Sequence, residues 1–188
     1  MRRGMTLIEL VTGMGLMALL VLGSMTLHAG TMRSLQTTTS DVTMTDQTSR
    51  ALRKVAENIR QAVSVTTGTG GTSITYNLPA ISSFVDPVTG EKEVSMPPAS
   101  DGINRGYTVN FSAGTVSDSQ TGQVLVRDVC SYDPDPNSTL YNKAYVPFQL
   151  VTIGTYKGVT INIITRDAKG LNPRTVRMKT TTILRNAP

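Results

Sequence analysis

An uncharged and largely apolar stretch of 23 residues runs from Leu10 to Met32. A helix rises about 1.5 Å per residue, so this stretch is long enough to cross a bilayer core about 30 Å thick. Glu9 stands directly before it. A carboxylate at the centre of a membrane helix costs about 2.5–3.5 kcal/mol, and less near the interface. The sequence therefore predicts a membrane helix that begins with a carboxylate in need of a partner.

The residues in front of this helix form a short motif. Arg2 and Arg3 precede Gly4, and Met5 opens the segment that leads to Glu9. The motif resembles the processing site of the type IV pilin and pseudopilin family. The resemblance implies that a prepilin peptidase cuts between Gly4 and Met5, that Met5 is then N-methylated, and that Glu9, fifth in the mature chain, serves filament assembly. The family usually has Phe where this chain has Met5.

Two other interpretations of the N-terminus stay open. A secretory signal also combines a basic start, an apolar core and a small-residue cleavage site, for which Ser24 or the pair Ala29 and Gly30 would qualify. An uncleaved anchor would keep its basic N-terminal residues on the cytoplasmic side through the positive-inside rule. Both leave Glu9 without a reason for its position, so the pilin-type interpretation is favoured.

An apolar stripe at helical spacing follows the uncharged run. It consists of Leu52, Val55, Ala56, Ile59 and Val63. The first proline is Pro79, so no residue forbids one helix from about residue 5 to residue 63. The predicted parts are a leader (1–4), a transmembrane or filament-core helix (5–32), its amphipathic continuation (33–63) and a β-rich globular head (64–188).

Beyond residue 64 the pattern changes to short strands and turns. Single strands are predicted at Ser73–Leu78 and Gln123–Val129, the latter with Val126 and Val129 on opposite faces. Hairpins are predicted from 107–111 with 115–116, and from 159–165 with 175–184 around a turn at 170–173. The stretches 82–106 and 131–147 are expected to be loops. The predicted fold class is α+β, a long N-terminal helix packed against an antiparallel sheet, as in pilins.

Three further stretches resemble the J-type pseudopilin and its minor-pilin relatives. They are Leu52–Val63, Leu125–Val129 and Leu184–Asn186. The resemblance covers about thirty N-terminal residues strongly and the rest of the chain in architecture more than in letters.

The sequence offers no catalytic constellation, so an enzyme is not expected. The single cysteine, Cys130, cannot form an intrachain disulfide, and the single histidine, His28, lies at the far end of the uncharged run. Cys130 is therefore expected to be a buried structural thiol. Asp133, Asp135 and Asn137 have the spacing that opens a calcium loop, but the later glycine and acidic ligand are missing. No catalytic residue, cofactor or metal is predicted.

The C-terminal third is rich in basic side chains. They are Lys157, Arg166, Lys169, Arg174, Arg177, Lys179 and Arg185. Such a patch could meet DNA phosphates. Arg177 and Lys179 alternate with Val176 and Met178, however, which is typical of a solvated sheet face, and basic edges discourage aggregation. The solvated face is favoured over DNA binding.

These observations give an expected function. The chain is expected to be a minor pilin or pseudopilin of a type IV pilus, type II secretion or competence filament. Its expected partners are other pilin subunits, prepilin peptidase, the inner-membrane assembly machinery and, before assembly, membrane lipid. It would cross the inner membrane once, with an extracytoplasmic head. The alternative is a membrane-anchored periplasmic or cell-surface binding domain that acts outside a filament.

Overall fold

The computed structural model describes residues 6–85, 87–94, 98–167 and 174–185. The chain divides into two compact units, Met1–Val42 and Thr43–Pro188. One helix, α1 (Leu7–Arg60), contributes residues to both. The strands are β1 (Ser64–Thr67), β2 (Ser73–Asn77), β3 (Ile81–Val85), β4 (Lys92–Val94), β5 (Arg105–Asn110), β6 (Thr115–Asp118), β7 (Val124–Arg127), β8 (Phe148–Ile153), β9 (Tyr156–Asp167) and β10 (Arg174–Ile183), and a 3-10 turn, η1 (Thr69–Gly71), follows β1.

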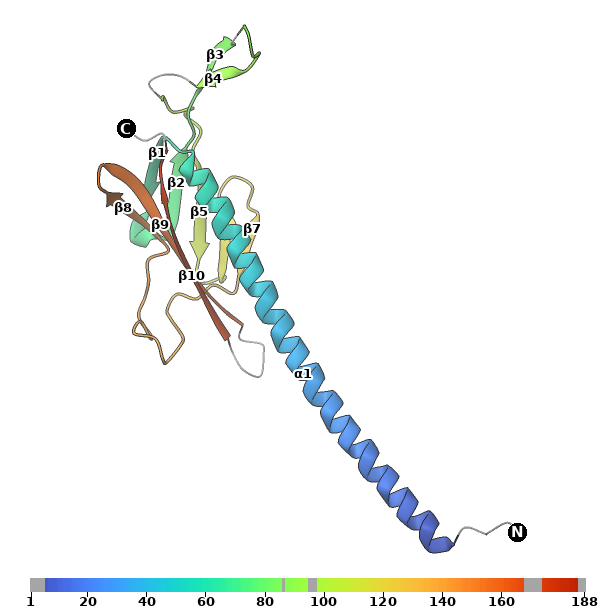
Figure 1. The fold of residues 1–188 in the computed structure, drawn as a ribbon. Helices are drawn as coiled ribbons and strands as arrows, with labels where there is room; N and C mark the ends of the chain where they lie inside the picture. Colours follow the sequence, from blue (N-terminus) through green and yellow to red (C-terminus); the bar gives the residue numbers. More distant parts are fainter. Residues whose placement is uncertain (1–5, 86, 95–97, 168–173, 186–188) are drawn as a thin grey trace. The chain divides into compact units, whose positions relative to one another are not determined.

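The strands of the second unit form antiparallel sheets (Figure 1). A five-stranded sheet has the order β1-β2-β5-β6-β7, a three-stranded sheet has the order β10-β9-β8, and β3 pairs with β4. Val129, just after β7, forms an isolated bridge with Thr165 of β9 and so connects the two larger sheets. The architecture is α+β, as predicted, although several sheets stand where one was expected.

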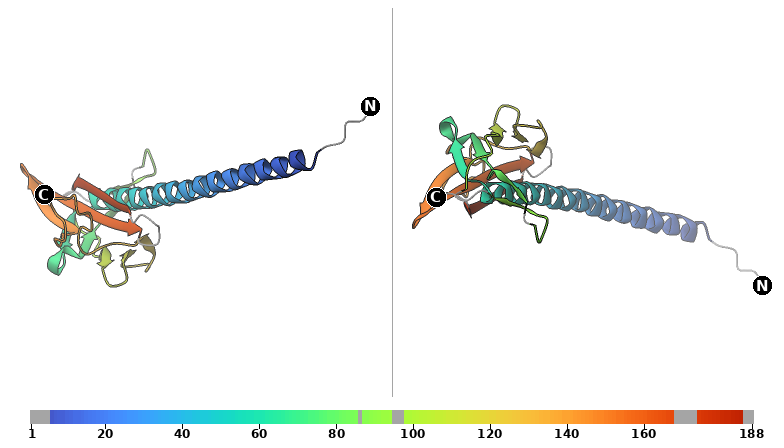
Figure 2. Two further views of the ribbon diagram at one scale, coloured as in Figure 1. Left: turned by 90° about the horizontal axis from the view of Figure 1, so that it is seen from below. Right: turned by 90° about the horizontal axis from the view of Figure 1, so that it is seen from above.

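The core of this unit lies between the C-terminal part of α1 and the two larger sheets (Figure 2). Leu52, Val55 and Ile59 of α1 are buried there, so the helical stripe that the sequence predicted does pack against strands. The strands contribute Ile74, Tyr76, Tyr107, Val109, Val116, Val126, Phe148, Val159, Ile161 and Ile163. Helix side chains three or four residues apart therefore pack against alternate side chains of the strands in one apolar layer.

Tyr107 adds a polar contact to this layer. Its ring stacks on that of Tyr76 with centroids 5.9 Å apart, and its hydroxyl accepts a 2.5 Å hydrogen bond from Asn58 Nδ2 on α1. Because Tyr107 is fully buried, this bond satisfies a phenol that would otherwise be costly to bury. The bond also fixes how α1 lies on β5.

The helix ends at Arg60, three residues before the predicted Val63. Ala62, rather than Val63, completes the buried surface, because the chain leaves the helix and the Val63 amide donates to the carbonyl of Asn77, the last residue of β2. The Arg60 carbonyl accepts a 2.9 Å hydrogen bond from the Arg185 amide. The C-terminal segment thus satisfies one of the carbonyl groups that a helix end leaves unpaired.

Both predicted hairpins are confirmed. β5 pairs with β6 through Val109 and Val116, and β9 pairs with β10 over ten residue pairs from Arg174 and Asp167 to Ile183 and Gly158. The turn predicted at 170–173 lies outside the described residues, as does Asn186 of the last J-type stretch. The strand predicted at 73–78 is β2.

The predicted alternation along Gln123–Val129 is wrong. Val126 and Val129 are both buried in the same core, although they were assigned to opposite faces. Asp128 explains this, because its φ of 59° is left-handed and ends the regular pleat after Arg127. The prediction also treated 82–106 as loop, whereas most of β3 and β4 fall in that stretch, and it missed β1 and β8.

Candidate functional site

Glu9 lies in the first turn of α1 and has a partner in its own chain. Its Oε2 accepts hydrogen bonds from the Thr6 backbone amide at 2.9 Å and from Thr6 Oγ1 at 3.0 Å. Thr6 Oγ1 in turn lies 3.4 Å from the Glu9 amide, which donates to it. This is the reciprocal capping box of a Thr-x-x-Glu sequence, which satisfies otherwise unpaired amides at a helix start. Glu9 therefore has a local structural role.

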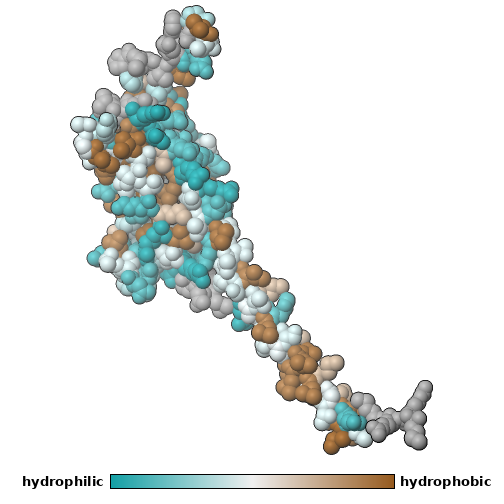
Figure 3. All heavy atoms as spheres, viewed as in Figure 1, coloured by the Kyte–Doolittle hydropathy of each residue, from teal (hydrophilic) through white to brown (hydrophobic). Residues whose placement is uncertain are grey.

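The N-terminal part of α1 has an apolar and exposed surface (Figure 3). The exposed apolar side chains include Leu7, Ile8, Leu10, Val11, Met14, Leu16, Met17, Leu19, Leu20, Val21, Leu22, Met25, Leu27, Met32 and Leu35. They are distributed around the helix rather than along one stripe, which is typical of a helix surrounded by lipid or by other helices. By length and composition, α1 could cross a membrane.

The threonines of this segment are compatible with an apolar surrounding. The hydroxyls of Thr12, Thr26 and Thr31 donate to the carbonyls of Ile8, Gly23 and Leu27, at 2.8, 2.8 and 2.5 Å. Each of these side chains therefore has a hydrogen-bond acceptor within the helix and needs no water for it. The segment can enter lipid without an unpaired hydroxyl donor at these positions.

The two residues of the predicted cleavage and methylation site, Gly4 and Met5, lie outside the described residues. The structure therefore places one of the three predicted site residues, Glu9. Its partner Thr6 was not predicted, although a threonine three residues before a glutamate at a helix start is a recognisable signal.

Cys130 follows β7 and is half-buried, not fully buried as predicted. Its amide donates to the Ile164 carbonyl at 2.9 Å, and burial raises the pKa of its thiol. A thiol with a raised pKa is a weaker nucleophile at neutral pH, because less of it is ionised. The position favours a structural role.

The acidic turn after Cys130 is occupied by a basic side chain of the same unit. Arg177 on β10 donates through Nη2 to Asp133 Oδ1 at 2.7 Å and to Asp135 Oδ2 at 2.9 Å. Arg177 is therefore not simply part of a solvated basic face, as the sequence analysis had it. The residues with the calcium-like spacing and the basic residue of the strand therefore belong to one ion-pair cluster. Among the described residues no three His, Cys, Asp or Glu side chains form a group that could hold a metal ion.

The other basic side chains of the C-terminal third are not gathered in one place. Arg166 and Arg174 border a groove beside Pro134 and Asp135, whereas Lys179 borders a different groove between α1 and β10. Lys169 lies outside the described residues. A continuous track for nucleic-acid phosphates does not follow from this distribution.

No protein-family model, curated protein or solved structure matches the chain. Its residues and their geometry are therefore what bears on its function.

Proposed function

We propose that this chain is a non-enzymatic structural subunit, a minor pilin or pseudopilin, of a type IV pilus, type II secretion or competence filament. One observation carries the proposal. The N-terminal part of α1 exposes apolar side chains all round, and its first turn contains Glu9, five residues after Gly4. A surface of this kind needs lipid before assembly and neighbouring helices after it.

The proposed path has two stages. The leader is cut between Gly4 and Met5 by prepilin peptidase. Until assembly the subunit stays in the inner membrane, with its head on the extracytoplasmic side. The assembly machinery then moves the helix from lipid into a bundle of equivalent helices. There Glu9 accepts a charge-assisted hydrogen bond from the methylated amine of a neighbouring Met5, which is strong where water is excluded.

The contact between Glu9 and Thr6 supports a second candidate function. Because Glu9 Oε2 is already satisfied within the chain, a capped helix that anchors a binding domain alone would need no neighbouring helix. This observation favours a single-pass anchored domain acting outside a filament as the second candidate. The two candidates differ in what happens at Gly4 and Met5.

The test is the intact mass of the protein extracted from membranes of a host with prepilin peptidase, and of the same host without it. The filament subunit loses Met1 to Gly4 and gains one methyl group, in the presence of the peptidase alone. A Gly4→Leu variant is the matched control and keeps its full length. Retention of Arg2 and Arg3 in both hosts supports the anchored domain, and cleavage near Ala29 supports a secretory signal. Either result contradicts the proposal.

A further inference from the structure

β10 forms one edge of the three-stranded sheet. It pairs with β9 along its full length, and no strand among the described residues pairs with its other side. An edge strand presents a row of backbone N–H and C=O groups that can pair with another chain. Proteins usually shorten or cover such edges, but β10 is ten residues long.

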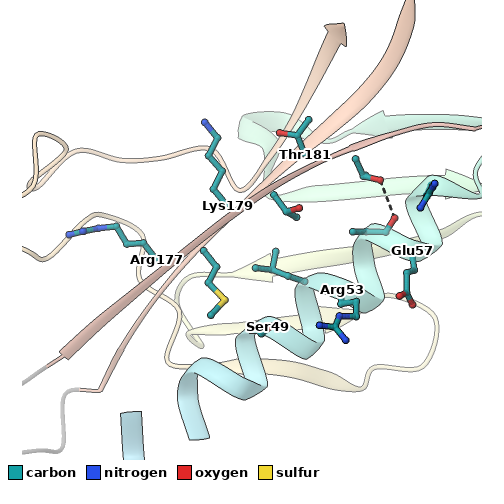
Figure 4. Close-up of a pocket in the computed structure, with 12 residues that line it drawn as sticks. Ser49, Arg53, Glu57, Arg177, Lys179 and Thr181 are labelled. Atoms are coloured by element: carbon teal, nitrogen blue, oxygen red, sulfur yellow. Dashed lines mark hydrogen bonds between the residues drawn. The ribbon is translucent and has the colours of Figure 1, made fainter. Parts of the chain in front are cut away.

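A groove of about 570 Å³ runs beside this edge, between β10 and the C-terminal part of α1 (Figure 4). On the β10 side it is lined by the consecutive residues 177–182. Successive side chains of a strand point to opposite faces, so a groove that touches consecutive residues borders the edge of the strand and not one of its faces. Thr182 Oγ1 donates to the Ala56 carbonyl at 3.4 Å and joins the two walls.

The walls of the groove carry unpaired positive charge. Figure 4 shows Arg53 and Glu57 on α1 and Lys179 on β10, at opposite sides. In that view the Lys179 side chain points away from α1, and those of Arg53 and Glu57 point away from β10, so these charges lie at the rims of the groove. Arg60 is a further cation of the lining, which gives three cations without an ion-pair partner among the described residues against one carboxylate, Glu57. Arg53, Arg60 and Lys179 have no ion-pair partner in the part of the chain that the structure describes, whereas the Arg177 guanidinium is held by the acidic turn.

We propose that this groove binds an extended, acidic polypeptide segment of a partner protein, which adds to β10 as a further strand. Six residues of a strand span about 20 Å, so the segment would pair with 177–182 over about that length. Backbone hydrogen bonds to the open edge supply affinity, and acidic side chains opposite Lys179 and beside Arg53 supply selectivity.

Two other occupants fit this groove less well. A second copy of β10 would bring its own Arg177 and Lys179 to a groove that already carries an excess of cations, and like charges repel. A nucleic acid could meet the cations, but it has no peptide groups to pair with the strand edge. The proposal is independent of the proposed filament, because both the groove and the strand edge lie within the second unit.

The experiment uses the full chain in a non-ionic detergent and a fluorescent hexapeptide of the sequence Asp-Asp-Thr-Thr-Asp-Asp, which presents aspartate on both faces of a strand. Fluorescence anisotropy is expected to show binding with a Kd below about 1 mM. The same peptide with alternate backbone nitrogens methylated should bind about tenfold more weakly, because it cannot donate to the edge. A hexapeptide of lysine and threonine should not bind.

Variants of the protein locate the site. Lys179→Glu and Arg53→Glu should each weaken binding of the acidic peptide by about fivefold or more, since each replaces an attraction with a repulsion. Lys157→Glu changes an exposed lysine on β9 that does not line the groove and should leave binding unchanged. Equal binding of the methylated peptide, no effect of either groove variant, or a tighter Lys179-dependent complex with duplex DNA would each overturn the proposal.

Discussion

Arg177 on β10 holds Asp133 through a 2.7 Å contact between Nη2 and Oδ1. The Asp133 side chain is 1% exposed, and the Arg177 side chain is 37% exposed. The hydrogen bond from Arg177 lowers the pKa of the Asp133 carboxyl to about 2. A buried carboxylate is thus kept ionised by a partner that solvent still reaches, and the turn after Cys130 is fixed to the sheet.

Replacement of Arg177 by methionine should destabilise the second unit. It would leave the Asp133 carboxylate buried without its cation. We expect a loss of about 1–3 kcal/mol in the free energy of unfolding, less than for a fully buried pair because solvent reaches Arg177. Lys179→Met is the matched control on the same strand and should change it by less than about 0.5 kcal/mol. Urea unfolding of both variants measures this, and equal values would show that the ion pair contributes nothing net.

The same ion pair should make stability depend on pH in acid. An unfolded aspartate takes up its proton near pH 3.9, whereas folded Asp133 does so near pH 2. The unfolded state therefore binds more protons in between, and the stabilisation is complete above about pH 5 and is lost as the pH falls from about 4 to 2. Melting temperatures across this window should fall less steeply for Arg177→Met than for the natural chain. Identical slopes would contradict the assigned cause.

Two substitutions separate the capping role of Glu9 from its proposed role in assembly. Glu9→Gln keeps an oxygen that can accept from Thr6, so the cap is preserved, but it removes the charge. Glu9→Ala removes both the charge and the hydrogen bonds that Glu9 accepts from Thr6. If Glu9 pairs with a neighbouring amine, both variants should be cleaved normally and incorporated poorly into filaments. Normal incorporation of Glu9→Gln would leave Glu9 as a cap only.

Truncation should show that the C-terminal part of α1 belongs to the core of the head. A chain that begins at Thr43 keeps Leu52, Val55 and Ile59, and we expect it to be soluble, folded and monomeric. A chain that begins at Ser64 loses these three buried side chains, each worth about 1.5–3 kcal/mol, and uncovers the apolar side of the sheets.

Light scattering and thermal melting compare the two truncated chains. The longer one should melt cooperatively, and the shorter one should aggregate. A monomeric shorter chain with an unchanged melting temperature would contradict the packing of α1 on the sheets.

Much of the fold follows from local patterns in the sequence. The spacing of Leu52, Val55 and Ile59 identified the buried face of the helix, because periodicity depends on side chains that a helix brings together by itself. The hairpins β5–β6 and β9–β10 were also predicted, since each joins neighbouring strands. β8 was missed, although its six residues include four apolar ones and are followed by Gly154 with φ 64°, which suits a tight turn before β9.

The sequence by itself determined the uncharged helix, the short motif in front of it and the α+β class. These depend on composition and on neighbours along the chain. Only the tertiary structure decided that Arg177 neutralises Asp133, 44 residues away, and that the edge of β10 borders a groove against α1. It also decided that Val129 joins Val126 in one core, through a single left-handed residue at Asp128. Contacts between distant segments depend on how the sheets stack, and no local pattern encodes that.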